Sequence, residues 1–237
     1  MAPPPITTAS ITVPSQQNGT PFVTLGPGGR PLGLPPSVSS MSGPPPLQLQ
    51  FVMSASDVDQ LPETPAEIAI VGRSNVGKSS LINALANRNQ LAKVSKTPGR
   101  TQLLNLFVLP DGTTLMDLPG YGYAKVPARV RATWGAMIEG YLLGREGLNL
   151  VVVLLDGEIG PTANDLDTIE WMRANEIEHR IVATKHDKVK PSQRDKRKKE
   201  LASKCGLEMK DVLWVSSAKN VNIDQLRSRV REWLKPV

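Results

Sequence analysis

The chain changes its pattern of apolar and polar residues near residue 57. Beyond that point, short apolar runs such as EIAIV (67–71) and LVVVLL (150–155) alternate with longer stretches in which apolar residues recur at a helical period. Short runs of this kind are typical of buried strands, and the longer stretches are typical of helices packed on a sheet. The pattern predicts strands at 67–71, 102–109, 113–117, 149–155, 179–184 and 211–215, and helices at 78–88, 127–143, 162–175, 191–204 and 222–234.

One connection between consecutive strands has the signature of a hairpin. The tetrapeptide PDGT (110–113) is an Asp-Gly turn, whereas the later strands are joined through helices. Helices between strands imply a mainly parallel sheet that is covered on both faces. We therefore expect an α/β, three-layer fold with a mainly parallel, six-stranded sheet, one antiparallel edge strand and helices on both faces.

The N-terminal part of the chain has a different composition. Residues 1–46 contain 12 of the 21 prolines, and residues 1–56 contain no acidic residue and one basic residue, Arg30. This segment has too little periodic apolar surface to offset the entropy of ordering it. We expect a disordered Pro/Gly-rich tail over 1–50 and one folded domain over 51–237. An organellar targeting segment, or a start at Met41 or Met53, are alternative interpretations of the tail.

Composition excludes several classes of protein. No apolar run approaches the roughly 18 residues of a membrane span, so no membrane partner is expected. A single cysteine, Cys205, excludes an internal disulfide framework, and two histidines are too few for a zinc site. The net charge of +6 admits a polyanionic partner if the cations cluster. We expect a monomer in a reducing compartment, the bacterial cytoplasm or, if the tail is a targeting segment, an organelle matrix.

The octapeptide GRSNVGKS (72–79) fits the phosphate-loop pattern G-x-x-x-x-G-K-[ST]. It follows a predicted strand and opens a predicted helix, which is the context that the mechanism requires. Its backbone N–H groups and the helix N-terminus favour bound phosphates. Lys78 is expected to reach the β- and γ-phosphates, and the Ser79 hydroxyl to bind Mg²⁺. The pattern indicates a nucleoside triphosphate and a P-loop NTPase fold, and it leaves the base open.

Two later strand ends carry residues suited to guanine. TKHD (184–187) follows the strand RIVAT, and the Asp187 carboxylate can accept two hydrogen bonds from guanine, a pattern that adenine cannot supply. Lys185 would pack over the base or brace the phosphate loop. VSSAKN (215–220) follows the next strand, where backbone N–H groups near Ser217 can bind the guanine oxygen. Successive strand ends are where open α/β sheets bind ligands.

These segments together resemble one family. GRSNVGKSSLINAL, KTPGRTQLLN, DLPGYGYAKV, TKHD and SSAK are similar to the EngB (YihA/YsxC) family of ribosome-assembly GTPases, within the Era-like group of TRAFAC GTPases. The resemblance covers about residues 50–237. Thr184 stands where most GTPases have Asn, as is common in this family. The resemblance implies a GTPase that binds GTP and GDP and hydrolyses GTP slowly. It also implies a nucleotide switch that acts on the precursor of the large ribosomal subunit, with the rRNA and proteins of that precursor as partners.

The resemblance also assigns residues to the nucleotide and its metal. It implies Mg²⁺ bound by Ser79 and Thr101, with Asp117 acting through a water, and it gives Lys78, Asn75, Thr101 and Gly120 roles in hydrolysis. The residues implied in GTP binding are Gly72, Arg73, Ser74, Asn75, Val76, Gly77, Lys78, Ser79, Gly99, Arg100, Thr101, Gln102, Leu103, Asp117, Leu118, Pro119, Gly120, Thr184, Lys185, His186, Asp187, Val215, Ser216 and Ser217.

Hydrolysis presents a difficulty at Tyr121. It stands after Gly120, where Ras-like enzymes carry a glutamine that positions water. Two sources of catalytic power are open: a K⁺ ion bound through Asn75, as in related Era-like proteins, or the ribosomal particle itself. We expect Tyr121 and Tyr123 to contact a partner, and Trp134, Tyr141, Trp171 and Trp233 to pack against the sheet.

The segment KVKPSQRDKRKK (188–199) carries seven cations and one acidic residue. It is either a solvated helix face or a contact surface for rRNA phosphates. Four further cations of the last predicted helix and its end could extend it: Arg227, Arg229, Arg231 and Lys235. An RNA-binding module with incidental hydrolysis, and a small-molecule phosphotransferase, remain rival functions.

Overall fold

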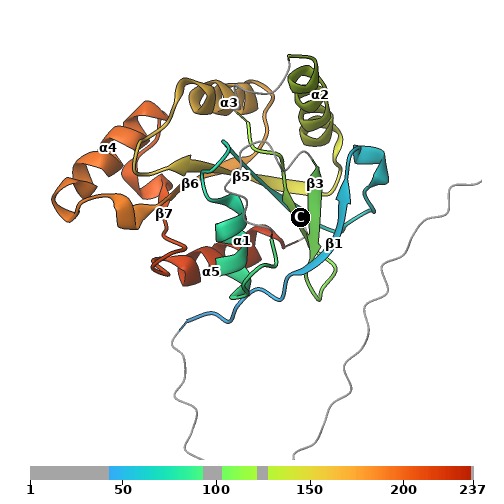
Figure 1. Cartoon of the computed structure of the whole chain (residues 1–237), viewed down its shortest axis with the longest axis horizontal. Helices are drawn as coiled ribbons and strands as arrows, with labels where there is room; N and C mark the ends of the chain where they lie inside the picture. The colour runs from blue at the N-terminus through green and yellow to red at the C-terminus, as the bar shows by residue number, and fades with distance from the viewer. Residues whose placement is uncertain (1–42, 93–102, 122–127, 236–237) are drawn as a thin grey trace, which may run out of the picture.

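The computed structural model describes residues 43–92, 103–121 and 128–235, without the side chains of 128–134 (Figure 1). Its strands are β1 (Gln50–Ala55), β2 (Glu67–Gly72), β3 (Leu104–Val108), β4 (Thr114–Asp117), β5 (Leu148–Asp156), β6 (His179–Thr184) and β7 (Leu213–Trp214). Its α-helices are α1 (Lys78–Ala86), α2 (Ala128–Gly144), α3 (Ala163–Ala174), α4 (Arg194–Lys204) and α5 (Ile223–Trp233). Short 3₁₀ helices are η1 (Val58–Gln60), η2 (His186–Lys188), η3 (Pro191–Gln193) and η4 (Met209–Asp211).

The strands form one sheet in the order β1-β3-β4-β2-β5-β6-β7. β4, β2, β5, β6 and β7 are parallel, and β3 is antiparallel to both of its neighbours. The β3–β4 hairpin turns at Gly112, whose φ of +83° suits glycine. The mainly parallel α/β fold and the hairpin predicted from the sequence are therefore confirmed.

The sheet has seven strands in the described part of the chain, so the prediction of six was wrong. The additional strand is β1, which pairs with β3 and makes it the second strand from the edge. Ahead of β1, Leu47 and Leu49 are buried, although the sequence assigned them to the N-terminal tail. The Leu47 N–H donates to the Leu85 carbonyl of α1 (3.0 Å). The packed part of the chain therefore begins before residue 51, while the division into tail and domain otherwise stays a prediction.

Helices cover both faces of the sheet, as Figure 1 shows, with α2 and α3 on one side and α1 and α5 on the other. The first apolar cluster includes Tyr141 of α2, Ile169 of α3 and Leu201 of α4. The second includes Leu81 of α1 and Leu226 of α5. Each face of the parallel strands is thus buried by helices, which explains the nearly continuous apolar sequence of β5.

A buried carboxylate joins the sheet to α2 at the start of β2. Glu67 is fully buried and accepts hydrogen bonds from Arg145 Nε (2.9 Å), the Tyr141 hydroxyl (2.6 Å) and the Thr114 hydroxyl (2.7 Å). Burial, followed by the Glu67 charge, raises the pKa of Tyr141 well above its usual value. The network satisfies a charge that would otherwise be costly to bury.

The remaining aromatic predictions can be compared with the structure where it describes the side chains. Tyr141 is fully buried, and Trp171 and Trp233 pack against the two clusters as expected. Trp134 and Tyr123 lie outside the described side chains. Among the described helices, none is both long and apolar enough to cross a membrane.

Candidate nucleotide-binding site

The phosphate loop lies between β2 and α1, where the sequence predicted it. Gly72 lies so close to β5 that an added Cβ would be 2.9 Å from the Leu154 carbonyl oxygen and from Val76 Cγ1. Gly77 has a φ of +109° and forms the N-cap of α1. Lys78 and Ser79 are the first two residues of that helix. Steric constraints therefore favour glycine at both positions, and the N-terminus of α1 points at the loop.

Half-buried Lys78 and buried Asp117 carry opposite charges beside the loop. Burial lowers the pKa of Lys78, and the Asp117 carboxylate acts in the opposite direction. Burial raises the pKa of Asp117 to about 6, against the opposing effect of Lys78. Asp117 Oδ1 is buried and has no hydrogen-bond partner among the described residues. An unsatisfied carboxylate oxygen at this position suits a hydrated Mg²⁺, and the hydroxyl of Ser79, the residue after Lys78, is a second hard ligand.

The segment after β4 lies directly on the phosphate loop. A Cβ added to Gly120 would lie 3.0 Å from Ser74 Cα and 3.2 Å from Lys78 Nζ, so this position admits no larger residue without movement. The Ser74 N–H donates to the Tyr121 carbonyl (3.1 Å), and Arg73 and Tyr121 form a parallel β-bridge. The sequence does not predict this pairing, because the residues are far apart in the chain.

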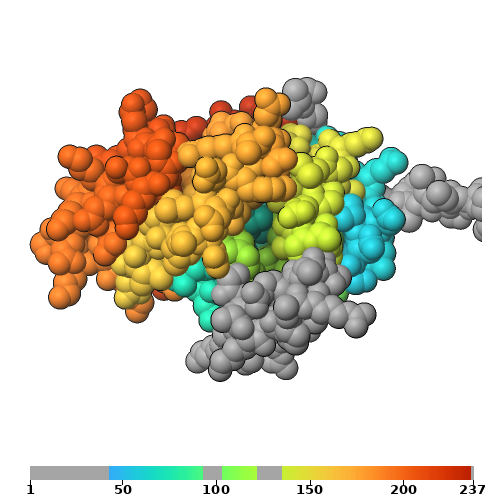
Figure 2. All heavy atoms as spheres, turned by 90° about the horizontal axis from the view of Figure 1, so that it is seen from above, coloured from blue at the N-terminus to red at the C-terminus, as the bar shows by residue number. Residues whose placement is uncertain are grey.

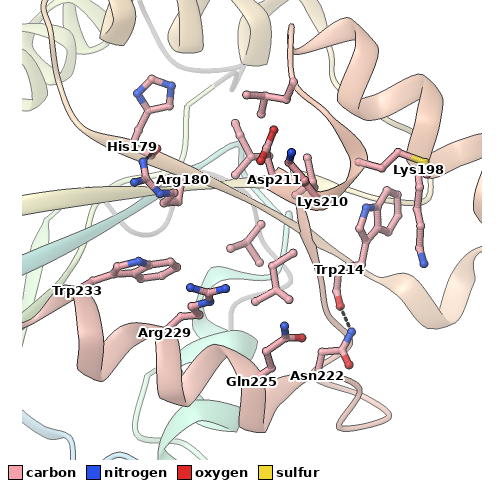
Figure 3. A pocket seen from close by; sticks show the side chains of 16 residues that line it. His179, Arg180, Lys198, Lys210, Asp211, Trp214, Asn222, Gln225, Arg229 and Trp233 are labelled. Atoms are coloured by element: carbon pink, nitrogen blue, oxygen red, sulfur yellow. Dashed lines mark hydrogen bonds between the residues drawn. The ribbon is translucent and has the colours of Figure 1, made fainter.

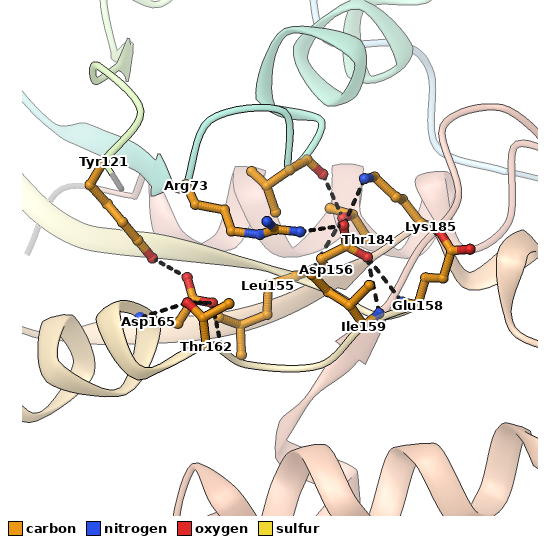
Figure 4. Close-up of polar contacts among 11 residues, drawn as sticks. Arg73, Tyr121, Leu155, Asp156, Glu158, Ile159, Thr162, Asp165, Thr184 and Lys185 are labelled. Carbon is orange, nitrogen blue, oxygen red and sulfur yellow. Dashed lines mark hydrogen bonds and ion pairs between the residues drawn. The ribbon is translucent and has the colours of Figure 1, made fainter. Parts of the chain in front are cut away.

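The side chain of Tyr121 points away from the phosphate loop toward α3 (Figure 4). Its hydroxyl donates to Asp165 Oδ1 (2.8 Å), while Asp165 Oδ2 accepts from the Thr162 N–H and hydroxyl (both 2.8 Å). Burial and the Asp165 charge raise the pKa of Tyr121, which keeps the phenol protonated. The ring is half-buried against the first apolar cluster, and the expectation that Tyr121 contacts a partner stays a prediction.

Asp156, at the end of β5, connects the phosphate loop to the loop that follows β6. Its Oδ2 accepts from Arg73 Nη2 (2.8 Å) and from Lys185 Nζ (2.7 Å), as Figure 4 shows. Burial would raise the pKa of Asp156, but Lys185 and the Glu158 N–H more than offset that effect and lower it. Sequence analysis did not identify Asp156. The signal was available, because an acidic residue ends the apolar run LVVVLL.

The loops that follow β6 and β7 are joined by hydrogen bonds. The Asp187 carboxylate accepts from the Ser216 hydroxyl (2.5 Å), and the His186 N–H donates to the Val215 carbonyl (3.1 Å). Thr184 Oγ1 lies 2.7 Å from the Val76 carbonyl oxygen, which links this region to the phosphate loop. The predicted base-recognition residues therefore lie with the phosphate loop at the carboxyl ends of the parallel strands.

The other predicted site residues are placed as follows. Leu118 and Pro119 are buried, so their side chains do not line an open site. The His186 ring packs edge-on against Trp214, with ring centroids 6.0 Å apart. Leu103 is 39% exposed. Gly99, Arg100, Thr101 and Gln102 lie outside the described residues.

The basic run forms an exposed surface, but the cations of α5 do not all belong to it. Figure 2 shows α4 (orange) at the end of the molecule opposite β1 (cyan). Arg227 is buried instead, and donates to the Leu85 and Ala84 carbonyls at the end of α1 (3.0 and 2.7 Å). Arg231 donates to the Pro45 and Pro46 carbonyls. The suggestion that these two arginines extend the basic surface was therefore wrong.

Comparisons with known proteins agree with the site. A family model described as "50S ribosome-binding GTPase" matches residues 67–185. A probable GTP-binding protein EngB from Desulforapulum autotrophicum is 43% identical over 189 residues, which are 79% of this chain and 97% of the relative. One from Clostridium perfringens is 50% identical over 159 residues, 67% of this chain and 81% of the relative.

Solved structures share the fold. The crystal structure of a probable GTP-binding protein EngB has a TM-score of 0.59 at 24% identity, covering 71% of this chain and 98% of that one. Aquifex aeolicus Era bound to GDP and AlF₄⁻ has a TM-score of 0.58 at 23% identity, covering 71% of this chain and 56% of that one. With these relatives and the phosphate loop in place, the chain belongs to the EngB family of GTP-binding proteins, which are GTPases.

Proposed function

We propose that this GTPase is a nucleotide-dependent switch that binds the precursor of the large ribosomal subunit in its GTP state and leaves after hydrolysis. The observation that carries this proposal is the continuity of two surfaces. Asp187 is followed directly by the basic run 188–199, which leads through η2 and η3 into α4. A change of nucleotide can therefore act on a cationic surface suited to RNA phosphates. The family model's description, which names ribosome binding, favours the same partner.

We assign guanine recognition to Asp187. Its carboxylate can accept from the N1 and N2 donors of guanine, and the Ser216 hydroxyl, 2.5 Å away, orients it. Lys185 has a left-handed backbone (φ +56°), and its ammonium group is bound to Asp156. That ion pair leaves the alkyl stem of Lys185 available to pack on the base. The other residues assigned to GTP are Gly72–Ser79, Gly99–Leu103, Asp117–Gly120, Thr184, His186 and Val215–Ser217.

Mg²⁺ suits the donors beside the phosphate loop. We assign it to the hydroxyls of Ser79 and Thr101, with Asp117 holding it through a water. When bound, the ion neutralises charge on the β- and γ-phosphate oxygens. Asp117 then gains a cation for a carboxylate oxygen that is otherwise buried without a partner.

In hydrolysis a water attacks the γ-phosphorus, and the bond to the β–γ bridging oxygen breaks to give GDP and phosphate. Lys78 balances the phosphate charge, and the Gly120 N–H is assigned to the γ-phosphate. Tyr121 cannot act as a base or position water as an amide would, because its hydroxyl is protonated and donates to Asp165. Slow intrinsic turnover is the consequence.

We assign part of the missing catalytic power to a K⁺ ion bound through Asn75. Such an ion would balance developing charge, which in other GTPases an arginine provides with an effect of about 10³–10⁵ in rate. Asn75 has a φ of +62°, so Asn75→Gly removes the amide without backbone strain. The expected result is faster turnover in K⁺ than in Na⁺, lost in this variant. Equal rates in both salts, with the variant unchanged, would leave the ribosomal particle as the activator.

The switch is tested by sedimentation with large-subunit particles in a non-hydrolysable GTP analogue and in GDP. We expect co-sedimentation with the analogue and release in GDP. Equal binding in both states would contradict a switch. A nucleotide-gated RNA-binding module with incidental hydrolysis is the alternative, and GTP-dependent binding to the particle that is unaffected by a change that blocks hydrolysis would favour it. The bacterial relatives favour the cytoplasm as its location.

A further inference from the structure

A pocket lies beside the edge of the sheet that is formed by β6 and β7. It has a volume of about 600 Å³ and lies between β6, η4 and α5 (Figure 3). This volume is within the range of small-ligand pockets, roughly 300–1,000 Å³. Lys198 of α4 also lines it, so the pocket is continuous with the basic run 188–199.

The charge of the pocket favours an anion. Four cations line it, Arg180, Lys198, Lys210 and Arg229, against one acidic residue, Asp211. Three of the cations pair with neighbouring glutamates: Arg180 with Glu178, Lys210 with Glu208 (2.8 Å), and Arg229 with Glu232 (3.5 Å). These arginine and lysine side chains are 48–76% exposed, and exposed pairs of this kind are weak. A phosphate can therefore compete for the cations.

The start of β6 extends beyond β7 beside the pocket. β7 pairs only with Val182 and Ala183, so the first three residues of β6 have no strand beside them on that side. The Ala183 carbonyl accepts from β7, whereas the Glu178 carbonyl accepts from β5 on the other side (2.9 Å). By the alternation of an extended strand, the backbone groups of His179 face the same side as those of Ala183, and the His179 carbonyl accepts from Arg180 Nη1 (2.9 Å).

Trp233 supplies an aromatic surface in the same pocket. Its ring is half-buried against the second apolar cluster, and its carbonyl accepts from Asn149 Nδ2 (3.2 Å). In Figure 3 the ring lies beside Arg229 and below Arg180. A flat apolar ring among cations is the combination used to bind single-stranded nucleic acid, in which bases stack and phosphates pair.

We propose that this pocket binds an unpaired nucleotide of single-stranded RNA, with its base on Trp233 and its phosphates on Arg229 and Lys210. The inference rests on the proposed RNA-bearing partner and names the feature of that partner that is recognised. An added peptide strand fits less well, because only three residues of β6 precede its pairing with β7, fewer than the five or six of a typical strand, and the His179 carbonyl already accepts from Arg180. The N-terminal tail does not complement the pocket, since residues 1–42 contain no acidic residue.

The proposal is tested by fluorescence anisotropy of a labelled oligouridylate of about ten nucleotides with the full-length protein bound to a non-hydrolysable GTP analogue, over a range of salt concentrations. We expect Arg229→Gln and Lys210→Gln each to make binding less dependent on salt, reducing the magnitude of the negative slope of log K against log salt by about 0.7. Trp233→Leu should weaken binding about tenfold and leave the slope unchanged. If Trp233→Leu fails to fold, the two exposed-residue variants still decide the question.

Arg88→Gln is the matched control, because Arg88 is exposed and contacts Leu49 next to the opposite edge strand, β1. It should bind like the unaltered protein. Unchanged binding in all three pocket variants, or equal affinity for an abasic oligonucleotide, would overturn the proposal. Displacement of the RNA by polyglutamate at equal charge would also overturn it, in favour of an acidic protein segment. Absence of oligonucleotide binding by the unaltered protein, together with GTP-dependent sedimentation, would refute the pocket alone. Oligonucleotide binding without GTP-dependent sedimentation would refute the switch.

Discussion

The negative charge of Asp117 lowers the stability of the folded protein but is needed to hold the metal, and Asp117→Asn should separate these two effects. The carboxylate is buried beside Lys78, and one of its oxygens has no hydrogen-bond partner among the described residues. Burial raises its pKa from 3.8 to about 6, and at about 1.4 kcal/mol per pH unit this shift destabilises the ionised folded state by about 3 kcal/mol. Asparagine resembles the protonated acid in shape and charge, so the variant should recover most of that free energy.

The pH dependence has a definite sign. Because the folded pKa lies above the unfolded one, the destabilisation is absent below about pH 4, grows between about pH 4 and 6, and is constant at higher pH. The difference in free energy of unfolding between Asp117→Asn and the unaltered protein should therefore be about 2–3 kcal/mol at pH 7 and close to zero near pH 4.

The assay is urea unfolding of the nucleotide-free protein in a metal chelator at both pH values. Asp59→Asn, at an exposed carboxylate of η1, is the control and should show no such dependence. Binding of GDP with Mg²⁺ should be weaker in Asp117→Asn, since the variant gains stability by losing the charge that holds the metal. An Asp117→Asn protein that is less stable at pH 7, or a difference that does not change with pH, would refute this reasoning.

Three other substitutions test the connections described above. Asp156→Asn removes the charge that joins the phosphate loop to the base loop, and isothermal titration should show GDP affinity reduced by roughly 2 kcal/mol, with unchanged affinity as the contrary result. Glu67→Ala leaves Arg145 buried without its partner and should lower the free energy of unfolding by about 3–5 kcal/mol in a denaturant titration, whereas a loss below about 1 kcal/mol would show that the network is dispensable. Tyr121→Phe removes the bond to Asp165 and should cost about 1–3 kcal/mol of stability while changing single-turnover GTP hydrolysis by less than tenfold. A hundredfold slower reaction at unchanged stability would instead make the phenol a catalytic group.

The parts of the fold that local sequence determines were predictable. The phosphate loop requires Gly72 for its close approach to β5 and Gly77 for its positive φ, and the Asp-Gly turn at 111–112 fixes the β3–β4 hairpin. The parallel strands β5 and β6 are apolar because both faces are buried. These features follow from neighbouring residues, so one sequence is enough to find them.

Features that depend on residues far apart in the chain were not predictable. β1 has the exposed apolar residue Phe51 on an edge strand that follows a proline-rich segment, so it lacks the alternation of a half-buried strand. Asp156 is 83 residues from Arg73 and 29 from Lys185, and no local pattern pairs them. Arg227 reads as a surface cation in the sequence, but α5 packs on α1 and turns it toward the end of that helix.

The convergence of the phosphate loop and the base-recognition loops on one guanine nucleotide is tested most directly by competition. Labelled GDP bound to the protein is displaced with unlabelled GTP, ATP or XTP, for the unaltered protein and for Asp187→Asn. We expect GTP to displace the label at concentrations at least about a hundredfold lower than ATP, since a site built for specific donors leaves polar groups unpaired with the wrong base. Asp187→Asn should shift the preference toward XTP, whose 2-oxo group can accept from an amide. Equal competition by ATP, or an unchanged preference in Asp187→Asn, would contradict guanine recognition at this edge of the sheet.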